Sequence, residues 1–177
     1  MRPEVYWLDL PGSGRLAIMP RPRAGDWLDD EIAGWREQGI DVIVSLLEAE
    51  EIAELGLQRE AVRCHDFGME FVSFPIPDGG VPATQREAMA LAEAIITRLK
   101  VGKGIGLHCR AGIDRSALIA ACVLVLLGMA PEPAFDLIAK ARRVKVPDTE
   151  GQREWVGMFH QMVASGGKLQ KSTKFTR

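Results

Sequence analysis

The chain has 177 residues, 47% of them hydrophobic and 26% charged, which is the balance of a globular protein with a buried core. Its formal net charge is −2, so the overall charge favours neither nucleic acid nor an anionic membrane as a partner. The longest apolar run, residues 117–127, is too short to cross a bilayer, which argues against stable membrane insertion. We therefore expect a soluble protein with a single domain over residues 1–165.

The cysteines and the two ends of the chain bear on its location. Three cysteines are an odd and widely spaced set, which is a poor disulfide framework and favours a reducing compartment. The N-terminal residues include an acid and a proline where a signal peptide needs an apolar core. Residues 166–177 are basic and lack periodicity, which predicts a flexible C-terminal tail. We expect a cytoplasmic monomer that binds no nucleic acid.

The N-terminal half alternates apolar, β-branched runs with polar, helix-forming runs. Asp26 is placed to cap a helix that Gly39 ends. The dense apolar run that starts at Asp41 is typical of an internal strand. In chain order we predict strands at 5–8 and 15–19, a helix at 26–38, a strand at 41–47, helices at 49–55 and 58–66, and a strand at 70–74.

The C-terminal half contains one short strand among longer helices. Thr84 and Glu87 form a capping-box pattern at the start of a helix. Residues 116–127 are apolar on all sides, which predicts a helix through the core. In chain order we predict a helix at 84–99, a strand at 104–108, and helices at 116–127, 132–142 and 149–163. The alternation predicts an α/β fold, with a central, mainly parallel sheet of about five strands and helices on both faces.

Residues 108–116, HCRAGIDRS, lie where the strand at 104–108 ends and the core helix begins. Unpaired N–H groups and the helix dipole make a helix N-terminus an anion site, and a tight loop adds further N–H donors. Arg115 adds a planar fork suited to two phosphate oxygens. Such surroundings lower a thiol pKa from about 8.5 to about 4–7, which would make Cys109 a thiolate nucleophile for phosphoryl transfer.

Phosphoryl transfer also needs a proton donor for the leaving group and a base for the attacking water. Asp78 is our candidate for both steps, because its loop, residues 75–83, follows a predicted strand and such loops gather at the ligand edge of an α/β sheet. Asp-Gly is also a common turn pair, so a purely structural role for Asp78 is the alternative. Asp66 is the other candidate acid.

The pattern His-Cys-x5-Arg-Ser over residues 108–116 resembles the signature of the cysteine-dependent protein tyrosine phosphatase superfamily, dual-specificity branch. PIPDGGVP is similar to the acid loop of its kinase-associated-phosphatase-like subgroup and bacterial relatives. The resemblance implies that Arg115 binds the phosphoryl group, Asp78 is the general acid and Ser116 assists release of the thiolate. It also implies that no metal or other cofactor takes part. The loop implied to donate backbone N–H groups to the phosphate comprises Arg110, Ala111, Gly112, Ile113 and Asp114, together with Arg115.

Four further positions take roles from this resemblance or depart from it. Gln152 matches the family glutamine that helps to place the hydrolytic water, and His108 is expected to order the loop. Asp114 stands where many relatives carry glycine. An acid there is seen in some phosphoinositide phosphatases, although bonding to the loop backbone or to Arg110 is the role we favour. Arg110 adds positive charge that suits multiply anionic ligands.

The remaining reactive side chains have plainer interpretations. We expect Cys122 and Cys64 to pack in helices, with a redox or metal role for Cys64 beside His65 as the alternative. The three histidines are scattered and show no metal-ligand spacing. Arg142 and Arg143 are expected to complement a helix dipole at a helix end, although they could flank the pocket.

These observations predict a metal-independent phosphatase that forms a cysteinyl-phosphate intermediate. The expected substrates are phosphotyrosine and/or phosphoserine/threonine in proteins or peptides, with phosphoinositides or other polyanionic phosphates as the alternative. A catalytically silent phosphate-binding module is a third hypothesis, which the presence of the thiol, the arginine and the acid disfavours. Sulfur or arsenate chemistry on a related anion loop is disfavoured because no second thiol lies close in sequence.

Overall fold

A five-stranded sheet forms the centre of the molecule in the computed structural model, which describes residues 2–172. The strand order is β1-β2-β5-β3-β4; only the β1–β2 pair is antiparallel, and the other three pairs are parallel. This confirms the predicted mainly parallel sheet. The strands are β1 (Tyr6–Trp7), β2 (Arg15–Met19), β3 (Val42–Ser45), β4 (Glu70–Ser73) and β5 (Gly104–His108).

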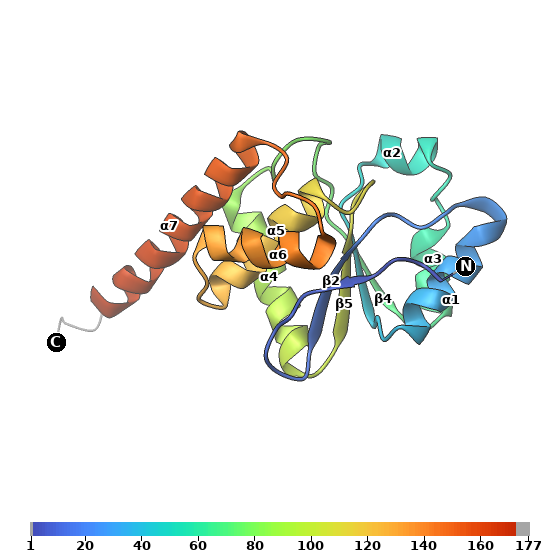
Figure 1. Cartoon of the computed structure of the whole chain (residues 1–177), viewed down its shortest axis with the longest axis horizontal. Coiled ribbons are helices and arrows are strands. Elements are labelled where there is room, and N and C mark those ends of the chain that lie inside the picture. Colours follow the sequence, from blue (N-terminus) through green and yellow to red (C-terminus); the bar gives the residue numbers. More distant parts are fainter. Residues whose placement is uncertain (1, 173–177) are drawn as a thin grey trace.

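Helices cover both faces of the sheet, as Figure 1 shows. Helices α1 and α3 lie on one face, and α4, α5, α6 and α7 lie on the other. Each face has its own cluster of buried hydrophobic side chains. The helices are α1 (Leu28–Glu37), α2 (Ala49–Glu54), α3 (Glu60–Asp66), α4 (Gln85–Lys100), α5 (Asp114–Leu126), α6 (Pro131–Arg142) and α7 (Glu150–Ser172).

Helix α5 is the core helix that the sequence predicted. The side chains of residues 115–125 are all buried, and α4, α6 and α7 pack around it. The helix begins at Asp114, two residues earlier than expected, so Arg115 and Ser116 lie in its first turn. This start matters for the site, because the unpaired N–H groups of the first turn then belong to the loop motif itself.

Strand register brings three strand ends to one level. His108 at the end of β5 pairs with both Met19 of β2 and Ser45 of β3. The loops that follow these strands therefore meet at the carboxyl edge of the parallel strands, where α/β proteins bind ligands.

Two predicted helix ends differ from those observed. Asp26 does not cap α1, because it lies in a 3-10 turn (Gly25–Trp27) that precedes the helix. Helix α7 runs on to Ser172, beyond the expected end at residue 163, so the segment predicted as a tail is helical up to that point. Glycine in a helix costs only about 1 kcal/mol and does not by itself end one, which explains the difference. Residues 173–177 of the predicted tail lie outside the described residues.

The helix start at residue 84 follows the prediction closely. The Thr84 hydroxyl oxygen accepts a hydrogen bond from the backbone N–H of Glu87 at 3.1 Å.

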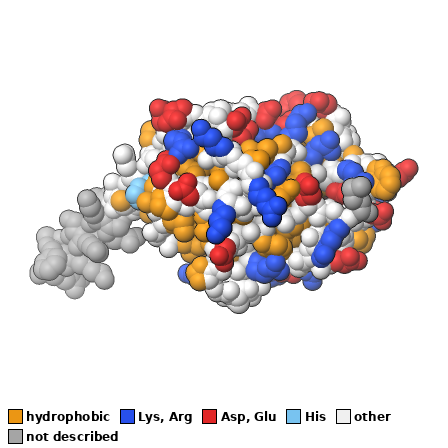
Figure 2. Space-filling model, in the orientation of Figure 1, with side chains coloured by type: hydrophobic (Ala, Val, Ile, Leu, Met, Phe, Trp, Pro, Cys, Tyr) orange, Lys and Arg blue, Asp and Glu red, His pale blue; other side chains and the backbone are white. Residues whose placement is uncertain are grey.

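On the molecular face in Figure 2, acidic and basic side chains are interspersed, in keeping with the small net charge. Within residues 2–172, no helix combines the length and the apolar character needed to cross a membrane.

Candidate active site

Residues 109–113 connect the end of β5 to the start of α5, and we call them the anion loop; the predicted loop, residues 110–115, runs on into the first turn of α5. Gly112 has a φ of +66°, a left-handed conformation that favours glycine. A Cβ at this position would also lie only 2.3 Å from the backbone carbonyl of Met19. The loop therefore packs directly against the end of β2, and glycine is required both for its torsion and for its space.

Cys109 begins this loop as a free thiol with 3% of its surface exposed. Burial raises the pKa of this thiol, but the neighbouring Ser116 hydroxyl, the Ser116 backbone N–H and the Ile113 N–H lower it. The positive charge of Arg115 lowers it further, and the net effect is a pKa below the ordinary value. The surroundings thus favour the thiolate, which is the nucleophilic form.

The guanidinium of Arg115 is fixed from several directions although only 1% of the residue is exposed. It donates to both carboxylate oxygens of Glu51 on α2, at 2.7 and 3.0 Å, and to the carbonyl of Ile76 at 2.9 Å. The Arg115 hydrogen bonds are the main influence that lowers the pKa of Glu51, to about 2. This bidentate pair orients the guanidinium at the base of the loop.

Sequence reasoning missed Glu51. Its place in the acidic run of residues 48–51 is typical of a solvated helix face, and glutamate is seldom buried. The one available signal was indirect, because a buried arginine needs a carboxylate partner. Nothing in the spacing of the chain shows which of the 24 acidic residues that partner is.

The structure brings Asp78 to the loop, as predicted. One carboxylate oxygen of Asp78 lies 3.2 Å from Nη2 of Arg115, and the side chain is 67% exposed. The Asp-Gly turn is also present, since Gly79 has a φ of +68°. The alternative acid, Asp66, ends α3 and pairs with Arg63 at 2.7 Å. Because Asp66 precedes β4, it lies at the amino edge of the sheet and is excluded as the acid.

Gln152 lies on α7 and is fully buried. Its side-chain amide donates to the carbonyl of Gly80 at 3.1 Å, while its Oε1 has no hydrogen-bond partner among the described residues. The glutamine therefore ties α7 to the loop that carries Asp78. This contact brings Gln152 next to the predicted acid.

His108 has the surroundings expected of a residue that orders the loop. Its Nδ1 lies 3.3 Å from the Cys109 carbonyl, and its Nε2 lies 2.8 Å from Oε1 of Glu60. Trp35 stacks on its ring with 5.9 Å between centroids. Burial lowers the pKa of His108, but Glu60 more than offsets this and the net shift is upward. Glu60, 2% exposed, is a second buried glutamate that sequence reasoning did not identify.

Two loop residues differ from expectation. Arg110 lies within 3.5 Å of carboxylates of Glu51 and Glu54, so its charge is already paired. Asp114 therefore does not bind Arg110, and its buried Oδ1 makes no hydrogen bond to the loop backbone or to any other described residue. Burial, with the nearby charges of Asp148 and Asp78, raises the pKa of Asp114. The favoured structural roles of Asp114 were wrong.

Arg142 also differs from expectation. Instead of pointing into solvent at the end of α6, it donates to the carbonyls of Gly112 at 3.0 Å and Ala111 at 3.2 Å. The guanidinium carbon lies 4.2 Å from the centre of the Tyr6 ring. Arg142 is thus part of the support of the anion loop.

The other two thiols have the inert surroundings that were predicted. Burial raises the pKa of Cys64 to about 12 and raises that of Cys122 as well. Both are free and buried.

Among residues 2–172 there is no cluster of three or more His, Cys, Asp or Glu side chains placed to hold a metal ion.

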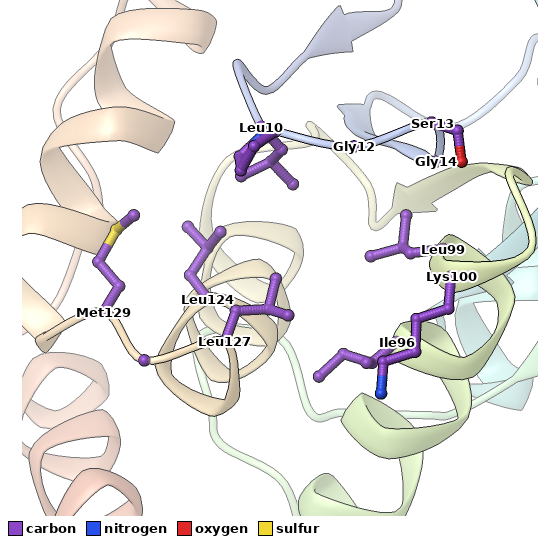
Figure 3. Close-up of a pocket in the computed structure, with 12 residues that line it drawn as sticks. Leu10, Gly12, Ser13, Gly14, Ile96, Leu99, Lys100, Leu124, Leu127 and Met129 are labelled. Carbon is purple, nitrogen blue, oxygen red and sulfur yellow. The ribbon is translucent and has the colours of Figure 1, made fainter.

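A separate cavity of about 590 Å³ lies at the amino edge of the sheet, away from the loop (Figure 3). The side chains of Leu124 and Leu127 from the end of α5 face it, together with Ile96 and Leu99 from α4. Lys100 is the charged residue in its lining. The lining contains no Cys, His, Asp or Glu, and Cys109, Arg115 and Asp78 lie at the opposite edge.

Comparison with known proteins identifies relatives of this chain. Rat cyclin-dependent kinase inhibitor 3 (Rattus norvegicus) is 31% identical over 101 residues, which are 56% of this chain and 47% of that protein. The chain spans about half the length of this relative and of three further curated relatives that it matches.

Two solved structures have the same fold. A kinase associated phosphatase with its catalytic cysteine replaced by serine has a TM-score of 0.84 at 23% identity, covering 93% of this chain and 97% of that one. PTPMT1 has a TM-score of 0.73 at 19% identity, covering 92% and 99%. Residues 17–129 match the family described as "Polymorphic toxin system, DSP-PTPase phosphatase". This match covers well over half of the sequence, and the chain belongs to that family of dual-specificity and tyrosine phosphatases.

Proposed function

We propose that the chain is a metal-independent phosphatase that hydrolyses phosphomonoesters through a cysteinyl-phosphate intermediate. The observation that carries the proposal is the arrangement around Cys109. A buried thiol with a lowered pKa lies at the start of an anion loop, and a fixed arginine and an exposed carboxyl group lie beside it. Nucleophile, phosphate-binding group and proton donor are thus supplied by the chain itself.

In the first step the Cys109 thiolate attacks phosphorus, a sulfur–phosphorus bond forms and the ester oxygen leaves. Arg115 and the loop N–H groups bind the non-bridging oxygens, whose charge they stabilise in the transition state. Asp78 gives its proton to the leaving oxygen, which would otherwise depart as a poorly stabilised anion. The products of this step are a free alcohol or phenol and the phosphorylated cysteine.

In the second step Asp78, now ionised, takes a proton from a water molecule that attacks the phosphorus. The sulfur–phosphorus bond breaks, phosphate is released and the thiolate returns. The Ser116 side chain lowers the pKa of the Cys109 sulfur, which supports its assigned role in release of the thiolate. Gln152 holds the Asp78 loop through Gly80 and would guide the water from the same side.

The contact between Asp78 and Arg115 sets a condition on this mechanism. One carboxylate oxygen of Asp78 lies 3.2 Å from Nη2 of Arg115, the group that also has to bind the phosphate oxygens. Substrate oxygens compete with Asp78 for Nη2 of Arg115. Binding of the phosphate group to Arg115 therefore releases the carboxyl group toward the leaving oxygen, where it acts as the acid.

For substrate class, we propose phosphotyrosine and/or phosphoserine/threonine in proteins or peptides. The phosphoinositide alternative rests on the acid at position 114 and on the charge of Arg110. Of these two features, the charge of Arg110 is paired with Glu51 and Glu54. A structure of PTPMT1 in complex with PI(5)P shares this fold, at 19% identity. The pairing of Arg110 favours a substrate with one phosphate group over a polyanionic one.

The test is hydrolysis of p-nitrophenyl phosphate in excess chelator by the wild-type chain, Cys109→Ser and Cys122→Ala. The wild type and Cys122→Ala should turn over, because Cys122 is an inert core thiol. Cys109→Ser should lose turnover while it still binds vanadate. Turnover by Cys109→Ser, or its loss in Cys122→Ala alone, would show that Cys109 is not the nucleophile.

A further inference from the structure

Arg142 makes contacts that the proposed mechanism does not use. It is the last residue of α6, and its guanidinium reaches the outer side of the anion loop. Nε donates to the carbonyl of Gly112 at 3.0 Å and Nη2 donates to the carbonyl of Ala111 at 3.2 Å. No Asp or Glu of the described residues forms a salt bridge with it, so its donors serve the loop.

The geometry of the peptide unit gives these two bonds a consequence on the other side of the loop. In a trans peptide, the carbonyl of one residue and the N–H of the next point in opposite directions. The two carbonyls that Arg142 binds share their peptide planes with the N–H groups of Gly112 and Ile113. Holding the carbonyls outward therefore directs both N–H groups away from Arg142.

One of these N–H groups acts on the nucleophile. The backbone N–H of Ile113, in the loop that Cys109 begins, lowers the pKa of the Cys109 thiol. The same peptide plane thus has Arg142 at its carbonyl end and the nucleophile at its N–H end. The positive guanidinium also polarises the peptide and strengthens its N–H as a donor.

Tyr6 fixes the arginine from a third, distant segment. Its ring lies 4.2 Å from the guanidinium carbon, within the range of a cation–π contact. Tyr6 belongs to β1, which pairs with β2 and is therefore anchored to the sheet. The flat guanidinium is held between this ring and the loop carbonyls, so little side-chain entropy remains to be lost when it binds the loop.

We propose that Arg142, held in place by Tyr6, is a positioning residue that turns the Gly112 and Ile113 N–H groups of the anion loop toward the phosphate and the nucleophile. This inference rests on the proposed function and extends it to residues that touch neither the substrate nor the sulfur. It assigns a role to β1 and to the end of α6, which otherwise only complete the fold.

Two quantities should change when Arg142 is lost: the reactivity of Cys109 as a function of pH, and the affinity for an oxyanion. The other groups that act on the thiol are Arg115 and Ser116 from α5 and His108 from β5, and none of them contacts Arg142. Asp78 and Asp114 are also left in place. A shift in the pH dependence of Cys109 reactivity or in oxyanion affinity therefore reports on the orientation of the Gly112 and Ile113 N–H groups.

The experiment follows alkylation of Cys109 by iodoacetamide against pH, using mass spectrometry of its peptide, and inhibition of turnover by vanadate. In Arg142→Gln the midpoint of alkylation should rise by about one pH unit and the vanadate inhibition constant by about tenfold, as expected for weakened charge-assisted hydrogen bonds. Arg142→Lys keeps the charge and should restore part of both. Cys64 and Cys122 do not interfere, because burial raises the pKa of both thiols.

Tyr6 and Arg143 supply the matched variants. Tyr6→Phe keeps the ring and should resemble the wild type, whereas Tyr6→Ala should show a smaller shift in the same direction as Arg142→Gln. Arg143→Gln removes an equal charge one residue away and should change neither quantity. If Arg142→Gln fails to fold, the alkylation midpoint and vanadate inhibition constant of Tyr6→Ala and Arg142→Lys can still be compared with those of the wild type.

The inference is overturned if Arg142→Gln leaves the alkylation midpoint and the vanadate inhibition constant unchanged, or if Arg143→Gln shifts them equally. In either case, a fully active wild type leaves the proposed function intact. A wild type that neither turns over nor is inhibited by vanadate overturns the proposed function and this inference with it.

Discussion

The two ends of helix α5 lie in very different surroundings. Its first turn faces the anion loop, where the buried Arg115 is paired with Glu51 and the thiol of Cys109 is buried as well. Its last turn faces an apolar cavity lined largely by aliphatic side chains, including Leu124 and Leu127. One rigid element therefore joins a region arranged for chemistry to a region arranged for packing.

The difference between the two ends shows how the free-energy cost of burying charged side chains is offset. At the loop edge, Arg115 is paired with Glu51, and His108 lies against Glu60. At the cavity edge burial is apolar and stabilises through the hydrophobic effect and packing. Substitutions at the first edge should therefore change turnover most, and substitutions at the second should change stability alone.

The largest effect of the three variants considered next is expected from Asp78→Asn, which removes the acid and leaves the loop intact. Loss of a general acid slows turnover by about 10²–10⁴-fold for substrates with poor leaving groups, such as alkyl phosphates. Activated aryl phosphates need less protonation and should be slowed much less. The measurement is kcat over a series of leaving groups.

Asp66→Asn is the matched control, because Asp66 pairs with Arg63 at the other edge. It should leave the series unchanged. Equal losses for all leaving groups in Asp78→Asn would contradict the assignment of the acid.

A smaller effect on turnover and a clear effect on stability are expected from Glu51→Gln. Loss of the carboxylate leaves the buried Arg115 charge poorly compensated and should cost about 3 kcal/mol of the free energy of unfolding at neutral pH. The folded pKa of Glu51 is lowered from 4.5 to about 2. Its stabilisation is therefore full above pH 4.5 and is lost as the pH falls toward 2.

The free energies of unfolding of the wild type and Glu51→Gln should accordingly converge on acidification, as denaturant titrations at several pH values will show. Glu54→Gln is the control, since Glu54 is exposed and contacts Arg110 rather than Arg115. A stability difference that stays constant between pH 5 and pH 2 would argue against a functional Arg115–Glu51 ion pair.

The smallest effect on turnover is expected from Leu124→Ala at the cavity edge. Leu124 is fully buried, and its truncation enlarges an existing cavity, which should cost about 2–5 kcal/mol of stability. Turnover at a temperature where the variant stays folded should remain within about twofold of the wild type. Leu127→Ala, at a half-exposed position, should cost less. A large loss of turnover in folded Leu124→Ala would mean that α5 couples its two ends.

The contrast between local and distant contacts also explains what the sequence could predict. Strands β2 and β5 were predicted with their observed bounds, because apolar runs between turn residues are local signals. The loop of residues 109–113 was predictable for the same reason, since its chemistry lies within nine consecutive residues. Asp78 could be found because its loop chemistry marks the end of a strand.

The supporting residues could not be found in this way. Glu51 is 64 residues from Arg115 in sequence, and Tyr6 is 136 residues from Arg142. Each looks ordinary in its own segment, as an acid on a helix or an aromatic residue in a strand. Their roles arise only when the sheet order brings their elements to one edge.

Gly112 has one more consequence, for the range of sequences that can fold to this site. The loop tolerates an arginine at position 110 and an acid at position 114, both of which differ in charge and size from small residues. Position 112 does not tolerate a side chain, because an added Cβ would clash with the backbone of Met19. Unlike a side chain, this backbone cannot change rotamer to relieve the clash. The residue with no side chain is therefore the most constrained position of the loop, and it limits how far the loop can diversify.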